Sequence, residues 1–577
     1  MTLSAQGARR FLPLLIPAAA FLLAFYLIPL ARFMVISVTE PSAGLGNYIA
    51  VLGSGLYWAV IVNTFEIAFT VAILCLLLAY PVALLIARLS GGARTAALIC
   101  VVVPFFTSDL VRNYAWIFLL GNRGVINTIL ISTGIIDSPL RLIFNRFAVV
   151  VAMTHILMPY VVLLLLNGIG ALDRRLTPAA ASLGAGAFGT FRRVILPMTR
   201  ESAVGGFVLV FVIGLAFFVT PAMLGGPSET MIANTIASEM GFLRWGFAAS
   251  LSAVMLVATF ATLGLVYALG GGLGAVTPEL ARSGKGRRRT RIPSFSRTFI
   301  LIDRVLDPVF DTLVAVIGIA LLAFLILPVV AVIPLSLSPK PYFEFPPSGI
   351  SFQWFEQYVT SPRWYRATLN SLMVGAGVAA LALAIGLPAA FAIARSRSRI
   401  AGALYVVALS PLVVPSIIIA VSVFVTMTSI GLNRSLLGVG LGQTISALPP
   451  ALIVLVAALK GFDWTLTRAG QSLGASPFMA VVKIALPIIG AAIGTAALLA
   501  FLQSFNDLLV ALFVSGLRTE TLPKRMWESL EEVNPTIAAV SALLVLATAI
   551  VLATLQIVRR GRRKAAPVPD ALTPERA

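Results

Sequence analysis

Four ionisable residues lie inside long apolar runs of this 577-residue chain, where a charge is costly unless it has a partner or a function. They are Glu66, Asp109, Arg112 and Asp507. Carboxylates around a central cavity would suit a cationic amine, whereas Arg112 would favour an anion. Two plainer readings stay open: Asp109 and Arg112 form an i,i+3 ion pair on one helix, and Asp507 caps a helix end. Nearby aromatic residues could line the same path or pack against helices and lipid, namely Tyr114, Trp116, Phe217 and Phe505.

A polar stretch occurs twice, once as residues 171–197 (the first loop) and once as residues 461–487 (the second loop). An Asp-to-Gly step of 11 residues and a Gly-to-Pro step of 13 recur in both, from Asp173 through Gly184 to Pro197 and from Asp463 through Gly474 to Pro487. Small residues let a short helix approach a partner closely, and the glycine permits a tight turn. Two loops with the same spacing predict two docking points for a partner, because plain Ala/Gly-rich linkers would not repeat it.

The composition predicts an all-α polytopic membrane protein. Hydrophobic residues make up 59% of the chain and charged residues 11%, and the mean hydropathy is +1.00. The net charge of +20 gathers beside the apolar runs, as topology signals do, so we expect no nucleic-acid partner. Cys75, Cys100 and the single His155 lie in apolar runs and are interpreted as buried side chains. The spacing of these residues predicts no catalytic centre and no metal site.

About twelve transmembrane helices are expected, the first of them uncleaved. The predicted spans are 11–37, 60–87, 95–120, 147–170, 202–224, 246–270, 308–336, 368–394, 401–430, 442–461, 487–514 and 535–558. They form a first half (1–270) and a second half (299–560), separated by a basic linker (271–298) and followed by a tail (561–577). Six spans per half predict a parallel repeat with a pseudo-two-fold axis along the membrane normal.

The repeat extends beyond the loops. Asn63-Thr64 precedes Pro81 by 18 residues, and Asn370-Ser371 precedes Pro388 by 18. This offset between the halves is 307 (370−63), whereas the offset between the loops is 290 (474−184). The difference of 17 predicts an insertion in the first half, which we assign to residues 121–146.

Basic residues predict the orientation. They gather after the second span, in the first loop, in the linker and in the tail, all on one side of a twelve-span chain. That side is expected to be cytoplasmic, with both termini and both loops. Acidic residues, Glu520, Glu528, Glu531 and Glu532, fall on the other side. Gly284-Lys285 continues with Gly286 and is not a phosphate-binding loop.

The paired loops resemble the EAA loop of ATP-binding-cassette importer permeases of the type I fold. The matching residues are Ala179, Ala180, Gly184, Leu196 and Pro197 in the first loop, and Ala469, Gly474, Leu486 and Pro487 in the second. Pro178 and Arg468 stand where the family has Glu, and Gly470 stands where it has its second Ala. The resemblance implies that separate ATPase subunits dock on these loops, and the missing Glu puts any salt bridge to them in doubt.

Other segments resemble the two spermidine/putrescine permeases, here fused. They are residues 110–127, 218–227, 504–507 and 521–523. The resemblance implies a polyamine-like cargo in a bacterial inner membrane, two ATPase subunits that carry ATP and Mg while this chain binds no cofactor, and a solute-binding protein on the outer face. Fused permeases are also typical of related importers, so ferric iron, thiamine, opine and aminoethylphosphonate remain alternatives. A secondary transporter would lack docking loops, and a membrane-embedded enzyme would need a polar catalytic cluster.

Overall fold

The computed structural model describes residues 11–173, 175–268, 297–340, 346–396, 398–531 and 536–565. These parts of the chain are helices joined by turns and loops, with no strand among them, so the all-α prediction is confirmed there. Most of the predicted linker with Lys285, most of the tail, Arg174 and Glu532 lie outside the described residues.

The helices of the first half run in this order: η1 (Leu12–Leu15), α2 (Ile16–Leu22), η2 (Leu23–Leu27), α3 (Ile28–Thr39), α4 (Gly46–Gly53), α5 (Gly55–Arg88), α6 (Gly91–Phe106), α7 (Asp109–Leu120), α8 (Val125–Ser132), α9 (Arg146–Gly170), α10 (Leu176–Ser182), α11 (Ala187–Thr190), η3 (Phe191–Ile195), α12 (Leu196–Met198), α13 (Arg200–Leu215), α14 (Val219–Leu224), η4 (Pro227–Glu229), α15 (Ile232–Gly241) and α16 (Trp245–Ala268).

The second half repeats this order: α17 (Arg297–Ser336), α18 (Gln353–Thr360), α19 (Pro362–Arg395), α20 (Arg399–Leu409), η7 (Ser410–Leu412), α21 (Ser416–Ser429), α22 (Leu436–Lys460), α23 (Thr465–Ser472), α24 (Pro477–Ala480), η8 (Val481–Ala485), α25 (Leu486–Ile488), α26 (Gly490–Asn506), α27 (Leu509–Val514), α28 (Leu522–Glu531) and α29 (Thr536–Ala565).

All twelve predicted spans are helical, but the third and fifth of each half are broken. Eight of the described helices are long and apolar enough to cross a membrane, or eleven if each of three bent pairs counts as one. The third span of the second half turns by 102° between α20–η7 and α21, where Pro415 precedes the new helix. Proline disfavours the helical conformation in the residue before it, which ends the first segment there.

Helix lengths and starts place the insertion. Helices α5 and α19 have 34 residues each and start 307 apart (362−55), while α9 and α22 have 25 each and start 290 apart (436−146). The 17 extra residues therefore lie between α7 and α9, where α8 stands. Phe144 and Arg434, also 290 apart, share a positive φ (59° and 61°) just before α9 and α22.

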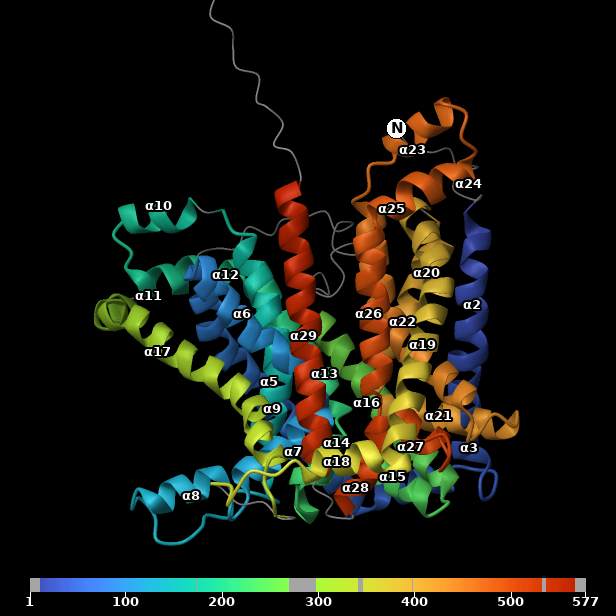
Figure 1. The fold of residues 1–577 in the computed structure, drawn as a ribbon, viewed down its shortest axis with the longest axis horizontal. Helices are drawn as coiled ribbons and strands as arrows, with labels where there is room; N and C mark the ends of the chain where they lie inside the picture. The colour runs from blue at the N-terminus through green and yellow to red at the C-terminus, as the bar shows by residue number, and fades with distance from the viewer. Residues whose placement is uncertain are drawn as a thin grey trace, which may run out of the picture.

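The first helix of each half packs against the opposite half. Helices α2 and α3 lie along α19, α20 and α21, whereas α17 lies along α5, α6, α7 and α11 (Figure 1). Each also contacts the last helix of its own half, α3 on α16 and α17 on α29. Side chains fix both crossings: Tyr26 Oη and Ser410 Oγ are 2.9 Å apart, and His155 Nε2 is 2.9 Å from the Leu325 carbonyl oxygen. The halves are thus interlocked.

Candidate functional site

The two loops fold alike up to their glycines. Asp173 Oδ1 accepts a hydrogen bond from the Arg175 N–H at 2.9 Å, and Asp463 Oδ1 accepts one from the Thr465 N–H at 2.9 Å. This bond holds the pKa of Asp463 below its usual value. A short helix follows each aspartate, α10 in the first loop and α23 in the second.

Both short helices end on a left-handed glycine. Gly184 has φ +80° and Gly474 has φ +92°. The N–H of the residue after each glycine bonds back across the turn, Ala185 to the Ala180 carbonyl at 3.0 Å and Ala475 to the Gly470 carbonyl at 3.1 Å. This is the Schellman arrangement, in which glycine adopts the positive φ without the strain of a Cβ. The turn that the spacing predicted is therefore present in both loops.

After its turn, each loop continues in helical segments that meet the next membrane helix at a sharp bend. Helices α11 to α12 meet α13 at 67°, and α24 to α25 meet α26 at 72°. Leu196-Pro197 and Leu486-Pro487 lie in α12 and α25, which continue from the π-helical segments η3 and η8 and end just before each bend. The loops stand at the same end of the molecule, with α10 on one side of it and α23 on the other (Figure 1).

Two leucines project from the tips of the loops. Leu183 is 88% exposed and Leu473 is 89% exposed, and each directly precedes the turn glycine. Helix α10 buries none of its residues, and α23 buries only Thr467. Ala179 and Ala469 are exposed as well. An apolar side chain is therefore exposed at the same place in both loops.

The departure at Gly470 has a packing reason. A Cβ at this position would lie 2.5 Å from Ile484 Cδ1. The corresponding pair in the first loop is Ala180 and Val194, because both positions are offset by 290. Valine has no Cδ atom, so the first loop has room for the alanine. Gly470 with Ile484 and Ala180 with Val194 therefore fill nearly the same total volume, with the larger share at the second position in the second loop.

The acidic residues proposed for the path have partners. Glu66 of α5 accepts a hydrogen bond from Arg146 of α9 at 2.7 Å, and both side chains are about half exposed. Asp109 pairs with the buried Arg112, which also donates to the Ile156 carbonyl at 3.3 Å. The i,i+3 reading of this pair is therefore the observed one. Of the four ionisable residues, three are committed to ion pairs.

Asp507 caps a helix. Its Oδ1 accepts a hydrogen bond from the Val510 N–H at 2.9 Å, at the start of α27. Gln443 of α22 holds the same break, because it accepts from Ser504 Oγ at 2.6 Å and donates to the Asp507 carbonyl at 3.3 Å. Phe217 occupies the corresponding break between α13 and α14, since 217 + 290 = 507. The breaks therefore put one residue predicted for the path at the same place in each half.

The aromatic residues predicted for the path do not gather at one site. Tyr114 and Trp116 are buried in α7, and Trp116 packs against His155 and Phe324 at 5.6 and 5.5 Å between ring centroids. Phe505 is half-buried and stacks on Phe501 at 5.6 Å. Trp116 thus belongs to the packing of α17 on the first half.

At the opposite end from the loops, the repeated Asn-Thr and Asn-Ser pairs pin short helices. Thr64 Oγ1 accepts from the Ile232 N–H at 2.9 Å, and Ser371 Oγ accepts from the Leu522 N–H at 2.7 Å. These are the first residues of α15 and α28. Asn63 and Asn370 donate to carbonyls just before the same helices. This geometry explains why the pair recurs at an offset of 307.

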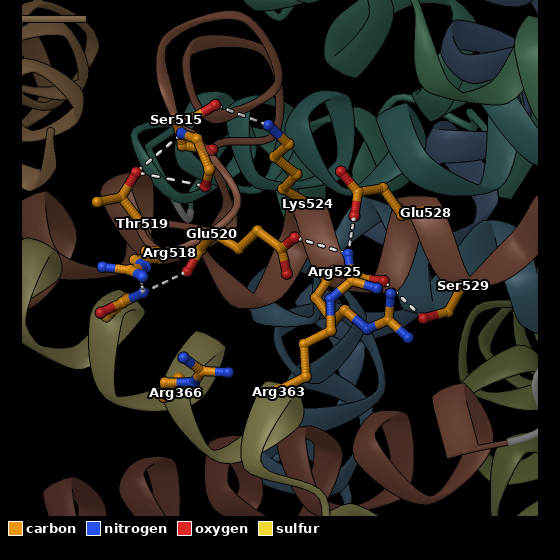
Figure 2. A network of polar contacts seen from close by, with 12 residues as sticks. Arg363, Arg366, Ser515, Arg518, Thr519, Glu520, Lys524, Arg525, Glu528 and Ser529 are labelled. Atoms are coloured by element: carbon orange, nitrogen blue, oxygen red, sulfur yellow. Dashed lines mark hydrogen bonds and ion pairs between the residues drawn. The ribbon is translucent and has the colours of Figure 1, made fainter. Parts of the chain in front are cut away.

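A network of charged side chains adds to this in the second half. Arg363 bridges Glu520 and Glu528 at 2.7 and 3.0 Å, and Lys524 donates to the Ser515 carbonyl at 2.8 Å (Figure 2). Burial and the neighbouring Glu520 raise the pKa of Glu528. The network ties α28 to the start of α19 and the end of α27. Beside it, Trp527 of α28 packs on Phe218 of the first half, with ring centroids 5.5 Å apart.

Sequence reasoning missed Arg146 and Trp527, and it missed Asp307 of α17, whose Oδ1 accepts a hydrogen bond from the Gly189 N–H of the first loop at 3.0 Å. Arg146 could have been singled out from the sequence, because it is a basic residue directly before a predicted apolar span. The other two act on the opposite half, and nothing in their local sequence indicates that contact.

Comparisons with known proteins match each half of the chain separately. The model of the family described as binding-protein-dependent transport system inner membrane component matches residues 77–274 and 382–564, together more than half of the chain. The spermidine/putrescine transport system permease protein PotB of Haemophilus influenzae is 33% identical over 43% of this chain and 89% of its own length. PotC of the same organism is 27% identical over 41% of this chain and 93% of its own length.

A solved bacterial alginate ABC transporter, in complex with an alginate-bound periplasmic protein, is 18% identical over 45% of this chain and 92% of that chain, with a TM-score of 0.40. The family match falls on both halves and covers both loops. The chain therefore belongs to the family of binding-protein-dependent transport system inner membrane components, as a multi-pass importer permease with both halves fused in one chain and its ATPase on separate subunits.

Proposed function

We propose that the chain is the membrane path for a small polyamine-like cation and that two copies of a separate ATPase drive it from the first and second loops. The observation that carries the proposal is the duplicated loop geometry, with the same left-handed glycine and the same exposed leucine in each copy. The spermidine/putrescine names of the relatives support the cargo. ATP and Mg are held by the ATPase, and a solute-binding protein delivers the cargo.

The docking test uses the full chain. Co-expression with the ATPase of the same transport system should yield a complex with two ATPase subunits per chain, measured by native mass spectrometry. The complex, reconstituted in proteoliposomes with its binding protein, should take up solute only when ATP is supplied. Uptake driven by an ion gradient without ATP would favour a secondary transporter instead.

The loop end faces the cytoplasm of a bacterial cell, and the binding protein docks at the opposite end of the molecule. The basic residues support this orientation, because Arg88, Arg192 and Arg193 lie at the loop end and the basic linker and tail follow the same pattern. A cysteine engineered at Lys285 should react with an impermeant maleimide only after the cells are permeabilised. Labelling of intact cells would contradict the orientation.

Two of the carboxylates that were predicted to meet a cationic cargo are paired in the structure. Glu66 pairs with Arg146 and Asp109 pairs with Arg112, so neither carboxylate is unpaired and available to bind an amine. Spermidine uptake should be competed by putrescine and not by thiamine, ferric iron, an opine or aminoethylphosphonate. Glu66→Gln with Asp507→Asn should lower uptake while the binding protein keeps its affinity. Wild-type uptake by this double variant would remove the acidic-path argument.

A further inference from the structure

The two loops differ at the start of their second short helix. Ser476 precedes α24, and its Oγ accepts a hydrogen bond from the Met479 N–H at 3.2 Å, as an N-cap does. The corresponding residue in the first loop is Gly186 (476−290), which has no side chain and precedes α11. The first loop therefore cannot cap this helix with its own N-cap residue.

The missing cap is supplied by the opposite half. Asp307 of α17 accepts a hydrogen bond from the Gly189 N–H at 3.0 Å through Oδ1. Gly189 is the third residue of α11, and Met479 is the third residue of α24, so the two caps act on the same N–H. A Cβ at Gly186 would overlap the Asp307 carboxyl group, which explains the glycine. A carboxylate at this place also suits the partial positive charge of the helix start.

The same face of α17 makes two more contacts with the first half. Phe310 lies 5.4 Å from both Phe188 and Phe191 between ring centroids, and it stacks on Phe191. Asp311 pairs with Arg88 at the end of α5, at 2.7 Å. Positions i, i+3 and i+4 lie on one side of a helix, so one face of α17 makes all three contacts with the first loop and its surroundings.

The second loop is linked to the first half only through Arg395 of its own half in the contacts that follow. Arg395, which corresponds to Arg88 (395−307), lies over the Trp464 ring at 4.4 Å and over the Phe11 ring at 5.5 Å. Phe11 belongs to the start of the first half and Trp464 to the second loop. This contact joins side chains only, whereas Asp307 holds the backbone of the first loop.

We propose that Asp307 is a positioning residue that ties the first loop to the second half, so that movement of the ATPase at this loop is delivered to both halves together. This inference rests on the proposed docking of an ATPase at the loops. A loop held only by its own half would transmit that movement to α9 and α13 of that half. With α17 attached, the second half must follow, because α17 also packs on α29.

The test separates two roles of Asp307, which are to cap α11 and to link the first loop to α17. Asp307→Ala removes both, Asp307→Asn keeps an acceptor at the same place, and Asp307→Ala combined with Gly186→Ser gives the loop its own cap without α17, as the second loop has. Ser398→Ala is the control, because it deletes an ordinary N-cap, from the Ile400 N–H at 3.2 Å, outside both loops. The readout is solute uptake per ATP hydrolysed in proteoliposomes that hold the full complex.

Asp307→Ala should lower this ratio by roughly fivefold, the factor that the loss of one hydrogen bond typically makes in an equilibrium, because the bond between α17 and the first loop is lost. Asp307→Asn should restore it, Ser398→Ala should leave it unchanged, and the double variant should remain low although its loop is capped. A double variant that recovers the wild-type ratio would show that Asp307 only caps α11, and the proposed link between the first loop and the second half would be wrong. An unchanged ratio in Asp307→Ala would overturn it as well. If the wild-type chain binds no ATPase, the docking proposal fails instead, and this is seen before any ratio is measured.

Discussion

The first and second loops have nearly the same backbone but different supports. Both have an aspartate at the start, a left-handed glycine after the first short helix, and bends of 67° and 72° into the next membrane helix. The first loop is capped by Asp307 from the opposite half, and the second is capped by its own Ser476. The backbone geometry has been kept while the side chains that stabilise it have diverged.

This difference indicates which features a docking loop needs. The exposed leucine, the turn glycine and the proline of the return helix occur in both copies, so they are the parts that we assign to the partner and to the turn. The glutamate of the EAA pattern is absent from both, and the second small residue is Ala180 in one and Gly470 in the other. The packing of these second positions follows the neighbouring side chain rather than the partner.

The largest effect is expected at the shared glycines. Gly184→Val and Gly474→Val should each abolish most ATP-dependent uptake, because a β-branched residue in the left-handed conformation costs at least about 1–2 kcal/mol. No atom lies within 4 Å of a Cβ at either position, so the cost comes from the backbone and not from a clash. Uptake and the amount of co-purified ATPase measure the effect.

Gly92→Val is the matched control for this pair, because a Cβ there also meets no atom within 4 Å and its φ is negative. It should retain uptake. If one loop tolerates valine while the other does not, the two copies are not equivalent docking points.

A moderate effect is expected from exchanging the packing pairs. Gly470→Ala should destabilise the second loop by about 1 kcal/mol or less, because the new Cβ overlaps Ile484 Cδ1, which is the end of a flexible side chain, while alanine favours a helix over glycine. Adding Ile484→Val should recover the loss, since this double variant has the Ala and Val of the first loop. Hydrogen exchange of residues 465–487 in the full complex measures the local stability. Failure of the second substitution to rescue would show that the two loops are not packed interchangeably.

An effect of comparable size is expected at Arg395. Arg395→Ala removes contacts with two aromatic rings, for which about 0.5–2 kcal/mol is typical. Arg395→Lys should lose part of this, because lysine lacks the planar group that stacks on a ring. Thermal unfolding of the purified chain measures both variants, and equal midpoints for alanine and wild type would show that the contact does not stabilise the second loop.

The smallest effect is expected at Arg88, the counterpart of Arg395. Its ion pair with Asp311 joins side chains that are 42% and 65% exposed, and such pairs contribute about 0–1 kcal/mol. The effect of Arg88→Ala should shrink further at high salt, whereas that of Arg395→Ala should persist. Repeating the unfolding series at two salt concentrations checks this, and a salt-resistant loss at Arg88 would contradict the assignment of its contact as a surface ion pair.

Local features of the fold were predictable from the sequence. Apolar runs gave the twelve helical segments, and the change of offset from 307 to 290 placed the insertion that holds α8. The spacing around Gly184 and Gly474 predicted the turns, because a positive φ is a local requirement that glycine meets within a few residues. The sequence also allowed both the ion pair of Asp109 with Arg112 and the helix cap at Asp507, and both are interactions between near neighbours.

Contacts between distant segments were decided only by the tertiary structure. The exchange of α3 and α17 between the halves, the pairing of Glu66 with Arg146 and the stacking of Trp527 on Phe218 join residues from 80 to more than 300 positions apart. The cap that Asp307 places on the first loop is of this kind, since a carboxylate on α17 reads locally as one more surface charge. Hydrophobicity and turn chemistry act over a few residues and are written in the local pattern, whereas which helix packs on which depends on the shape of the whole bundle.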